Sequence, residues 1–243
     1  MRPFLTWRWI LSHLFVIFML VLMINLGFWQ LRRLDQRRES NAEIRSAMAA
    51  ETVDLVDLLD SGIPPAEYTR VELTGTYDRD HEMLIANRTF ESRAGSWVVT
   101  PLVLDDGRTV AVVRGWVPRL WVAGSDTRDA GAPDGLVTVR GLAFSSIDGG
   151  KVADDKVHGL PELNRMDANR FDEVTGLEFD TTWVRLQTQD PPNGELPAPV
   201  PVRPLDEGPH QSYAIQWFLF STGTVVVYYL ILTRKKQELE SGK

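Results

Sequence analysis

Two long stretches of this chain, one near each end, contain no Asp, Glu, Lys or Arg and limit what the sequence can fold into. Trp9–Leu31 spans 23 residues and Gly208–Thr233 spans 26. Because about 20 apolar residues in a helix cross the hydrocarbon core of a bilayer, both stretches predict transmembrane helices. The predicted segments are a first transmembrane helix at 10–31, a central domain at 32–207, a second transmembrane helix at 210–233 and a tail at 234–243.

The first stretch could also be a cleavable signal peptide, since Arg2 and Arg8 give it a basic start. Two features argue against cleavage. The apolar run is longer than the core of a signal peptide, and Phe28 and Trp29 stand where a cleavage site needs small residues. We therefore expect an uncleaved anchor.

The basic residues beside the two stretches give conflicting indications of topology. Arg234, Lys235 and Lys236 follow the second stretch and favour a cytoplasmic C-terminus, whereas four arginines at 32–38 would keep the middle of the chain inside. The charge rule is weak for a loop this long, so we follow the second stretch. We expect both termini in the cytoplasm, the central domain outside, and the lipid bilayer around both helices.

Charge is divided unevenly along the chain, whose formal net charge is −7. Residues 32–207 carry 20 basic and 31 acidic side chains, while both ends are basic. This acidic balance implies no basic surface, so we expect no nucleic-acid partner. The absence of cysteine excludes disulfides, thiolate metal ligands and cysteine nucleophiles.

Between the apolar stretches, the hydrophobic pattern changes to a period of two. Short segments rich in Val, Thr and Trp are separated by turn signals such as Asp105–Gly107 and Ala132–Gly135. This pattern predicts a mainly antiparallel sheet or partly open barrel. Together with the two helices, it gives an α+β fold built on a transmembrane hairpin. The expected strands are Tyr68–Tyr77, Met83–Asn87, Gly95–Leu104, Thr109–Val117, Leu136–Phe144 and Trp183–Gln189.

Other segments are expected to be helical or extended. A polar helix at Asp35–Ala50 should continue from the first anchor, and Val53–Leu59 predicts a short amphipathic turn. Asp167 and Gly176 have the residue types that begin and end a short helix between them. Six prolines in Pro191–Pro204 predict an extended connector that leads back to the membrane.

No residue pattern indicates an enzyme. The chain has four histidines, without metal-ligand spacing, and no nucleophile elbow or phosphate-binding loop. The acidic residues around His81 could form a metal loop, but they lie between two expected strands, where a solvated hairpin is the simpler interpretation. For Arg114–Pro118, two interpretations stay open: Gly115 permits close packing and Pro118 ends a strand, or the segment forms a contact surface near the membrane.

The start of the second apolar stretch carries the most distinctive side chains. His210, Tyr213 and Trp217 are spaced three and seven residues apart, so a helix places them on one face. In a hairpin, the end of the first helix lies at the same membrane level, and a glycine there allows two helices to approach closely. The residues expected at that level are Gly27, Trp29, Gln30, Arg32 and Arg33.

This combination of side chains has two interpretations. An imidazole with aromatic walls and nearby arginines suits haem, because iron needs an axial ligand and propionates favour arginine. His210 could instead cap its helix or form a hydrogen bond at the membrane interface. No other metal site is expected.

Three segments in register resemble the Surfeit locus protein 1 family. Gly27–Arg33 is similar to its G-x-W-Q-L-x-R signature, Arg114–Pro118 to its R-G-W-V-P element, and Gly208–Trp217 to its G-P-H-x-S-Y-A-x-Q-W motif. Gln211 departs from the family pattern, in which Leu is common. The resemblance covers residues 10–235.

The resemblance implies an assembly factor for haem-copper cytochrome c oxidase rather than an enzyme. In bacterial members it implies delivery of haem a to the catalytic subunit, with His210 as the proposed ligand. Transient binding would suit a carrier, because a carrier must release its cofactor. The implied partners are the oxidase subunits, above all the catalytic haem-bearing one, and, as a further candidate, haem a synthase. The implied location is a bacterial plasma membrane. The alternative is a scaffold that stabilises an oxidase subunit or intermediate without contacting haem.

Overall fold

The chain forms two compact units. The computed structural model describes residues 6–121, 131–192, 194–202 and 204–241. The first unit, the helix pair, comprises Met1–Glu43 and Pro204–Lys243, and the second, the β domain, comprises Ile44–Arg203.

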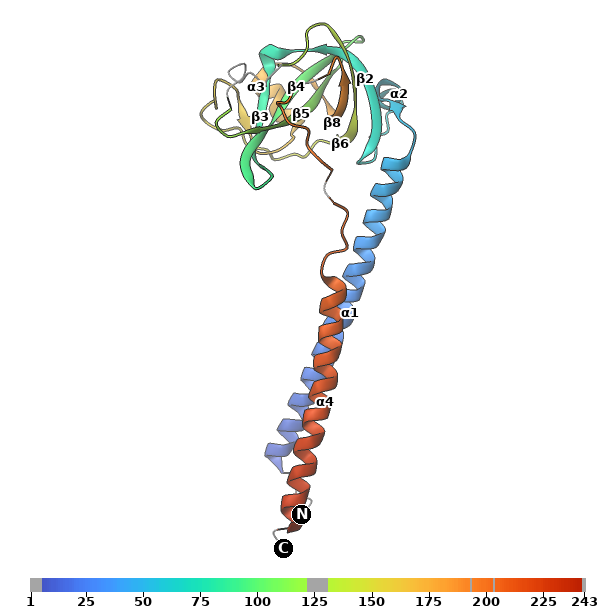
Figure 1. The fold of residues 1–243 in the computed structure, drawn as a ribbon, viewed down its shortest axis with the longest axis vertical. Coiled ribbons are helices and arrows are strands. Elements are labelled where there is room, and N and C mark those ends of the chain that lie inside the picture. Colours follow the sequence, from blue (N-terminus) through green and yellow to red (C-terminus); the bar gives the residue numbers. More distant parts are fainter. Residues whose placement is uncertain (1–5, 122–130, 193, 203, 242–243) are drawn as a thin grey trace. The chain divides into compact units, whose positions relative to one another are not determined.

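The helix pair is built from α1 (Trp7–Ala49) and α4 (His210–Ser241), which lie side by side (Figure 1). Helix α1 runs without a break past its apolar part, so the polar helix expected after the first anchor is confirmed. A spacing of seven residues keeps one narrow seam of a helix facing its partner. Buried positions follow that spacing, at Gly27, Leu34 and Asn41 on α1 and at Ala214 and Ser221 on α4.

Most apolar side chains of the helix pair point away from this seam. Phe15 and Phe18 on α1 and Leu219 and Phe220 on α4 are each more than half exposed. Both helices are long and apolar enough to cross a membrane. Because continuous apolar surface of this extent requires nonpolar surroundings, the chain is a membrane protein with two helices as its anchors.

The β domain is an eight-stranded sheet in the order β1-β2-β6-β8-β5-β4-β3-β7. A further pairing of β2 with β4 closes five of the strands into a ring. Three pairings are parallel (β1–β2, β3–β7 and β5–β8) and the others are antiparallel. The predicted fold class is therefore confirmed. The strands are β1 (Val53–Asp54), β2 (Thr69–Tyr77), β3 (Met83–Phe90), β4 (Arg93–Leu104), β5 (Thr109–Pro118), β6 (Leu136–Ser145), β7 (Glu162–Leu163) and β8 (Phe179–Asp190).

Strand β5 shows how the sheet holds its core together. Val110 and Val112 belong to one buried cluster, and Ala111 and Val113 belong to another. Successive side chains of a strand point to opposite faces, so β5 contributes to both clusters and is buried on both sides. The first cluster also includes α2 (Leu55–Asp60), and the second includes side chains from α3 (Ala168–Thr175).

All six expected strands form, but two extend well beyond the predicted bounds. β3 continues three residues past Asn87 to Phe90, and β8 begins at Phe179 rather than Trp183. The segment Val53–Leu59, expected as a turn, forms β1 and then α2, whose first turn is capped by the Asp54 carboxylate. Strand β7 was not expected, because a two-residue parallel strand leaves no periodic signal.

The short helix α3 (Ala168–Thr175) has the predicted ends. The Asp167 carboxylate accepts a hydrogen bond from the backbone N–H of Arg170, and Gly176 adopts a left-handed φ of 75°. Both features satisfy backbone groups that a helix end leaves unpaired, so this prediction is confirmed.

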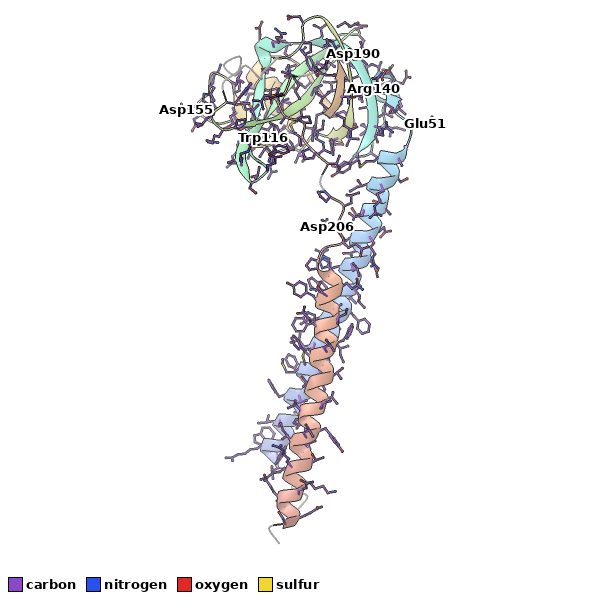
Figure 2. All side chains as sticks on the ribbon, viewed as in Figure 1. Glu51, Trp116, Arg140, Asp155, Asp190 and Asp206 are labelled. Carbon is purple, nitrogen blue, oxygen red and sulfur yellow. The ribbon has the colours of Figure 1, made fainter. Side chains whose placement is uncertain are left out.

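The proline-rich connector packs on the β domain for part of its length. The backbone of Ala198 exchanges two hydrogen bonds, of 2.7 and 2.8 Å, with Trp116 of β5, a residue labelled in Figure 2. A Cβ atom at Gly115 would lie 2.5 Å from the Ala198 carbonyl oxygen and 2.7 Å from that of Pro197. The close-packing interpretation of Gly115 is therefore confirmed, while Pro118 is the last paired residue of β5, opposite Gly95.

The acidic turn around His81 is only partly solvated. His81 Nδ1 lies 2.7 Å from the Asp78 carboxylate at the surface. Glu82, in contrast, is buried and accepts hydrogen bonds from Thr100 at 2.7 Å and from Arg114 at 3.0 Å. The interpretation of this segment as a solvated hairpin is wrong for Glu82, whose carboxylate neutralises a buried arginine.

Candidate functional site

The structure brings two of the singled-out side chains, His210 and Gln30, into direct contact. His210 is the first residue of α4 and Gln30 lies on α1, and the His210 Nδ1 atom is 2.9 Å from Gln30 Oε1. Gly208, with a φ of 67°, and Pro209 precede the helix, and the Pro209 carbonyl accepts the hydrogen bond from the N–H of Tyr213. The turn before α4 therefore directs the imidazole toward α1.

This contact favours one tautomer of the imidazole ring. A carboxamide oxygen can only accept a hydrogen bond, so the contact with Gln30 Oε1 is a hydrogen bond when Nδ1 carries the ring proton. In the neutral ring, the lone pair is then on Nε2. Among the residues that the structure describes, the His210 ring forms no other hydrogen bond. The ring is thus oriented by one nitrogen, and the other is available to a ligand.

The aromatic residues of the predicted site are not packed into the seam. Trp29 and Tyr213 are both 46% exposed, and Trp217 contacts Phe220 edge-to-face at 6.1 Å. Arg33 bonds to Gln36 on its own helix at 3.1 Å. These side chains leave apolar and cationic surface available near His210 on the helix pair.

Gly27 is a point of close approach between the two helices. A Cβ atom there would lie 2.8 Å from the ring of Phe218, which also meets Phe28 edge-to-face at 5.5 Å. Small residues permit such approach between membrane helices. Gly27 thus lies three residues before Gln30 on α1, next to the His210 contact.

The structure adds polar contacts that the sequence did not indicate. Arg38 forms an ion pair with Glu207 at 2.9 Å, and Asn41, which is 3% exposed, donates to the backbone oxygen of Asp206 at 2.9 Å. Both contacts hold the chain just before His210 against α1. The sequence does not single out Arg38 and Asn41 as contact residues, because both lie in a helix segment that is mostly polar.

A second polar group lies farther along the helix pair. The hydroxyl oxygen of Tyr228 lies 2.6 Å from His13 Nδ1 and 3.2 Å from the hydroxyl of Ser12. Polar side chains inside apolar runs are costly unless they are paired, and that rule could have identified His13 and Tyr228 from the sequence. In the part of the chain that the structure describes, no cluster of His, Asp and Glu could hold a metal ion.

These features define a two-anchor membrane protein whose second unit is a partly closed β barrel. The model of the SURF1 family matches residues 17–222, and the chain therefore belongs to the SURF1 family. This is a family of cytochrome oxidase assembly factors, which are not enzymes.

Individual relatives are similar over most of their length. The chain is 31% identical to a SURF1-like protein of Mycobacterium bovis, with 79% of this chain and 71% of the relative covered. It is 25% identical to a SURF1-like protein of Rickettsia bellii, with 89% of each covered. It is 26% identical to the human Surfeit locus protein 1, with 84% and 72% covered. The predicted family resemblance is confirmed.

Proposed function

We propose that this chain assists the delivery of haem a to the catalytic subunit of cytochrome c oxidase, with His210 as a transient ligand of the haem iron. The observation that carries the proposal is the 2.9 Å hydrogen bond between His210 Nδ1 and Gln30. Histidine ligands of metals usually donate their other ring N–H to a fixed acceptor. Gln30 supplies that acceptor, so Nε2 is the nitrogen that would bind iron.

The surroundings of His210 fit the chemistry of the cargo. Trp29, Tyr213 and Trp217 would supply apolar walls for the porphyrin, and Arg33 would pair with a propionate. Gly27 keeps the two helices close enough for His210 to reach Gln30. A single histidine also suits a carrier, because exchange of one ligand at the iron releases the cargo.

The proposal includes a location and a topology. We place the spans at 10–31 and 210–233 in a bacterial plasma membrane, with residues 32–207 outside and the tail at 234–243 in the cytoplasm. The basic cluster after the second span supports this orientation. The partners would be the haem-bearing oxidase subunit, as acceptor, and haem a synthase, as source.

Absorption spectra of the detergent-purified protein test the ligand. The protein is coexpressed with the enzymes of haem a synthesis and compared with His210→Ala, Gln30→Leu and, as a matched control, His158→Ala on the surface of the β domain. We expect a haem signal in the wild type and the control, loss in His210→Ala, and partial loss in Gln30→Leu. A signal of full strength in His210→Ala would exclude the ligand assignment.

The topology can be tested with single cysteines, because the natural chain has none. Asp155→Cys and Ser241→Cys are each exposed within their own unit. In intact cells, a membrane-impermeant maleimide should label the first and not the second. The reverse pattern would show that the β domain faces the cytoplasm.

A scaffold role is the second candidate, and the exposed aromatic side chains of the helix pair favour it. Trp29 and Tyr213 leave nearly half of their surface to a partner. The scaffold hypothesis expects His210→Ala to retain oxidase assembly in cells while Gly27→Glu blocks it, because a buried charge separates the helices. The haem hypothesis expects both substitutions to reduce assembly.

A further inference from the structure

The β domain contains a large cavity that the His210 site does not use. Its volume is about 940 Å³, and all of the residues that line it belong to this domain. The cavity lies on the second core cluster, which includes Phe144 and Trp183. Pockets of several hundred Å³ with apolar walls and a few polar groups are typical ligand sites.

Aromatic rings from three strands and a loop form one connected wall of this cavity. Phe144 stacks on Trp183 with ring centroids 4.6 Å apart, and Tyr68 meets Phe144 edge-to-face at 4.9 Å. Trp97 extends the series, with its centroid 6.4 Å from that of Trp183. Such a wall offers flat apolar area to an aromatic ligand.

Two arginines lie over this wall. The guanidinium carbon of Arg88 is 4.4 Å from the ring centroid of Trp97, and that of Arg185 is 4.9 Å from the centroid of Phe144. Arg185 is 8% exposed. Buried Nε of Arg88 and Nη2 of Arg185 have no hydrogen-bond partner among the described residues. Burial lowers the pKa of both side chains.

A comparison with Arg114 shows which interaction Arg88 and Arg185 lack among the described residues, namely a carboxylate partner. Arg114 is 2% exposed, and the carboxylate of Glu82 lies 3.0 Å from it. Within the described part of the chain, neither Arg88 nor Arg185 has an ion pair, and Glu67, the acidic residue in the cavity lining, is exposed. A buried cation without a counter-charge is costly, and the described residues provide no carboxylate for the buried Arg185 or for the half-buried Arg88.

Backbone irregularities place these side chains. A bulge between Ile85 and Arg88 shifts the register of β3, and Arg88 therefore lies opposite Gly95, on the same face as Trp97. Asn87 in this bulge has a φ of 58°, and Tyr68 has a φ of 67°. Such left-handed conformations are strained for residues other than glycine and are concentrated at binding sites.

We propose that this cavity binds a flat aromatic carboxylate, with its ring on the wall of Tyr68, Phe144, Trp183 and Trp97 and its acid group paired with Arg88 and Arg185. The planar guanidinium group matches a carboxylate with two parallel hydrogen bonds. The ligand supplies the counter-charge that the domain lacks. This inference does not depend on the iron ligand His210, since a carboxylate needs no metal to bind there.

Metal-free protoporphyrin IX, a flat ring with two carboxylates, is a suitable probe. Quenching of tryptophan fluorescence is titrated in the full-length, detergent-purified protein and in Arg185→Gln, Arg88→Gln and His210→Ala. The matched control is Arg140→Gln, an arginine of the same sheet that already pairs with Glu72. The dimethyl ester of the porphyrin and phosphatidylglycerol vesicles complete the set of ligands.

We expect Arg185→Gln and Arg88→Gln each to weaken porphyrin binding by about tenfold or more. The dimethyl ester should bind the wild type as weakly as the diacid binds these two variants. His210→Ala and Arg140→Gln should bind as the wild type does. Thermal melting of the ligand-free protein should be unchanged or raised in Arg185→Gln, because an unneutralised buried charge is removed.

Several results would overturn the proposal. One is unchanged affinity in both arginine variants, and another is an ester that binds as tightly as the diacid. A lower melting temperature of the ligand-free protein in both variants would assign the arginines a structural role. Displacement of the porphyrin by phosphatidylglycerol vesicles, sensitive to the same substitutions, would assign the cavity to lipid headgroups. Loss of haem in His210→Ala would leave the cavity proposal unaffected.

Discussion

The helix pair and the β domain cover their apolar side chains in opposite ways. The β domain covers its own, and Val112, Leu102 and Leu142 have no exposed surface. In the helix pair only a narrow seam is covered, and the phenylalanines outside it depend on lipid. An apolar side chain of a given size therefore contributes more to the folding stability of the β domain than to that of the helix pair. Only the β domain removes such side chains from water by folding.

Core truncation should show the largest difference. Phe171→Ala removes a ring that is 2% exposed and packs on Phe179, and we expect it to lower the free energy of unfolding of the β domain by about 4 kcal/mol. Phe15→Ala, at a position 64% exposed on α1, should change it by less than about 0.5 kcal/mol. Urea titration of the purified protein checks both, and equal losses would contradict the comparison.

The buried ion pair should follow in size. Glu82→Ala removes the carboxylate from Arg114 and Thr100, and we expect a loss of about 3 kcal/mol, because a buried charge loses its counter-charge. The control is Glu72→Ala, since Glu72 pairs with Arg140 at the surface, where the loss should stay below about 1 kcal/mol. The same urea titration measures both, and similar values would show that Arg114 does not depend on Glu82.

Helix packing should respond less strongly. Gly27→Leu places a side chain into the ring of Phe218, and we expect a cost of about 2 kcal/mol to the association of α1 with α4. In Gly223→Leu, a Cβ atom meets no described atom within 4 Å. Cross-linking of cysteines introduced at Ser12 and Tyr228 measures the association. Reduced cross-linking in Gly223→Leu alone would show that the seam lies elsewhere.

The smallest effect depends on pH. Burial raises the pKa of the Tyr77 hydroxyl, which donates to Gln189. The unfolded chain loses this proton first as pH rises, so the contribution to stability is complete below about pH 10 and declines above it by about 1.4 kcal/mol per pH unit. Tyr77→Phe should remove that slope. Denaturation at several alkaline pH values checks it, and parallel profiles would refute the assignment.

The sequence predicts features that depend on local patterns. The two apolar runs, the alternation along β2, and the caps Asp167 and Gly176 each follow from spacing within a few residues. The contacts between these elements do not follow from local spacing. The closure of β2 on β4, and the contacts of Glu82 with Arg114 and of Arg88 with Trp97, depend on residues distant in sequence or on a bulge. The sequence alone drew attention to His210 and Gln30, but their hydrogen bond required the paired helices.

The position of β8 has a consequence for the order in which the chain can fold. β5 and β6 follow one another in sequence, yet β8 lies between them in the sheet. Until Phe179–Asp190 has been synthesised, β5 and β6 each have an unpaired edge. Unpaired strand edges promote aggregation. The ring is therefore completed only after β8 has been synthesised, shortly before α4 emerges. A chain interrupted before Phe179 would be a substrate for proteolysis rather than a partly active protein.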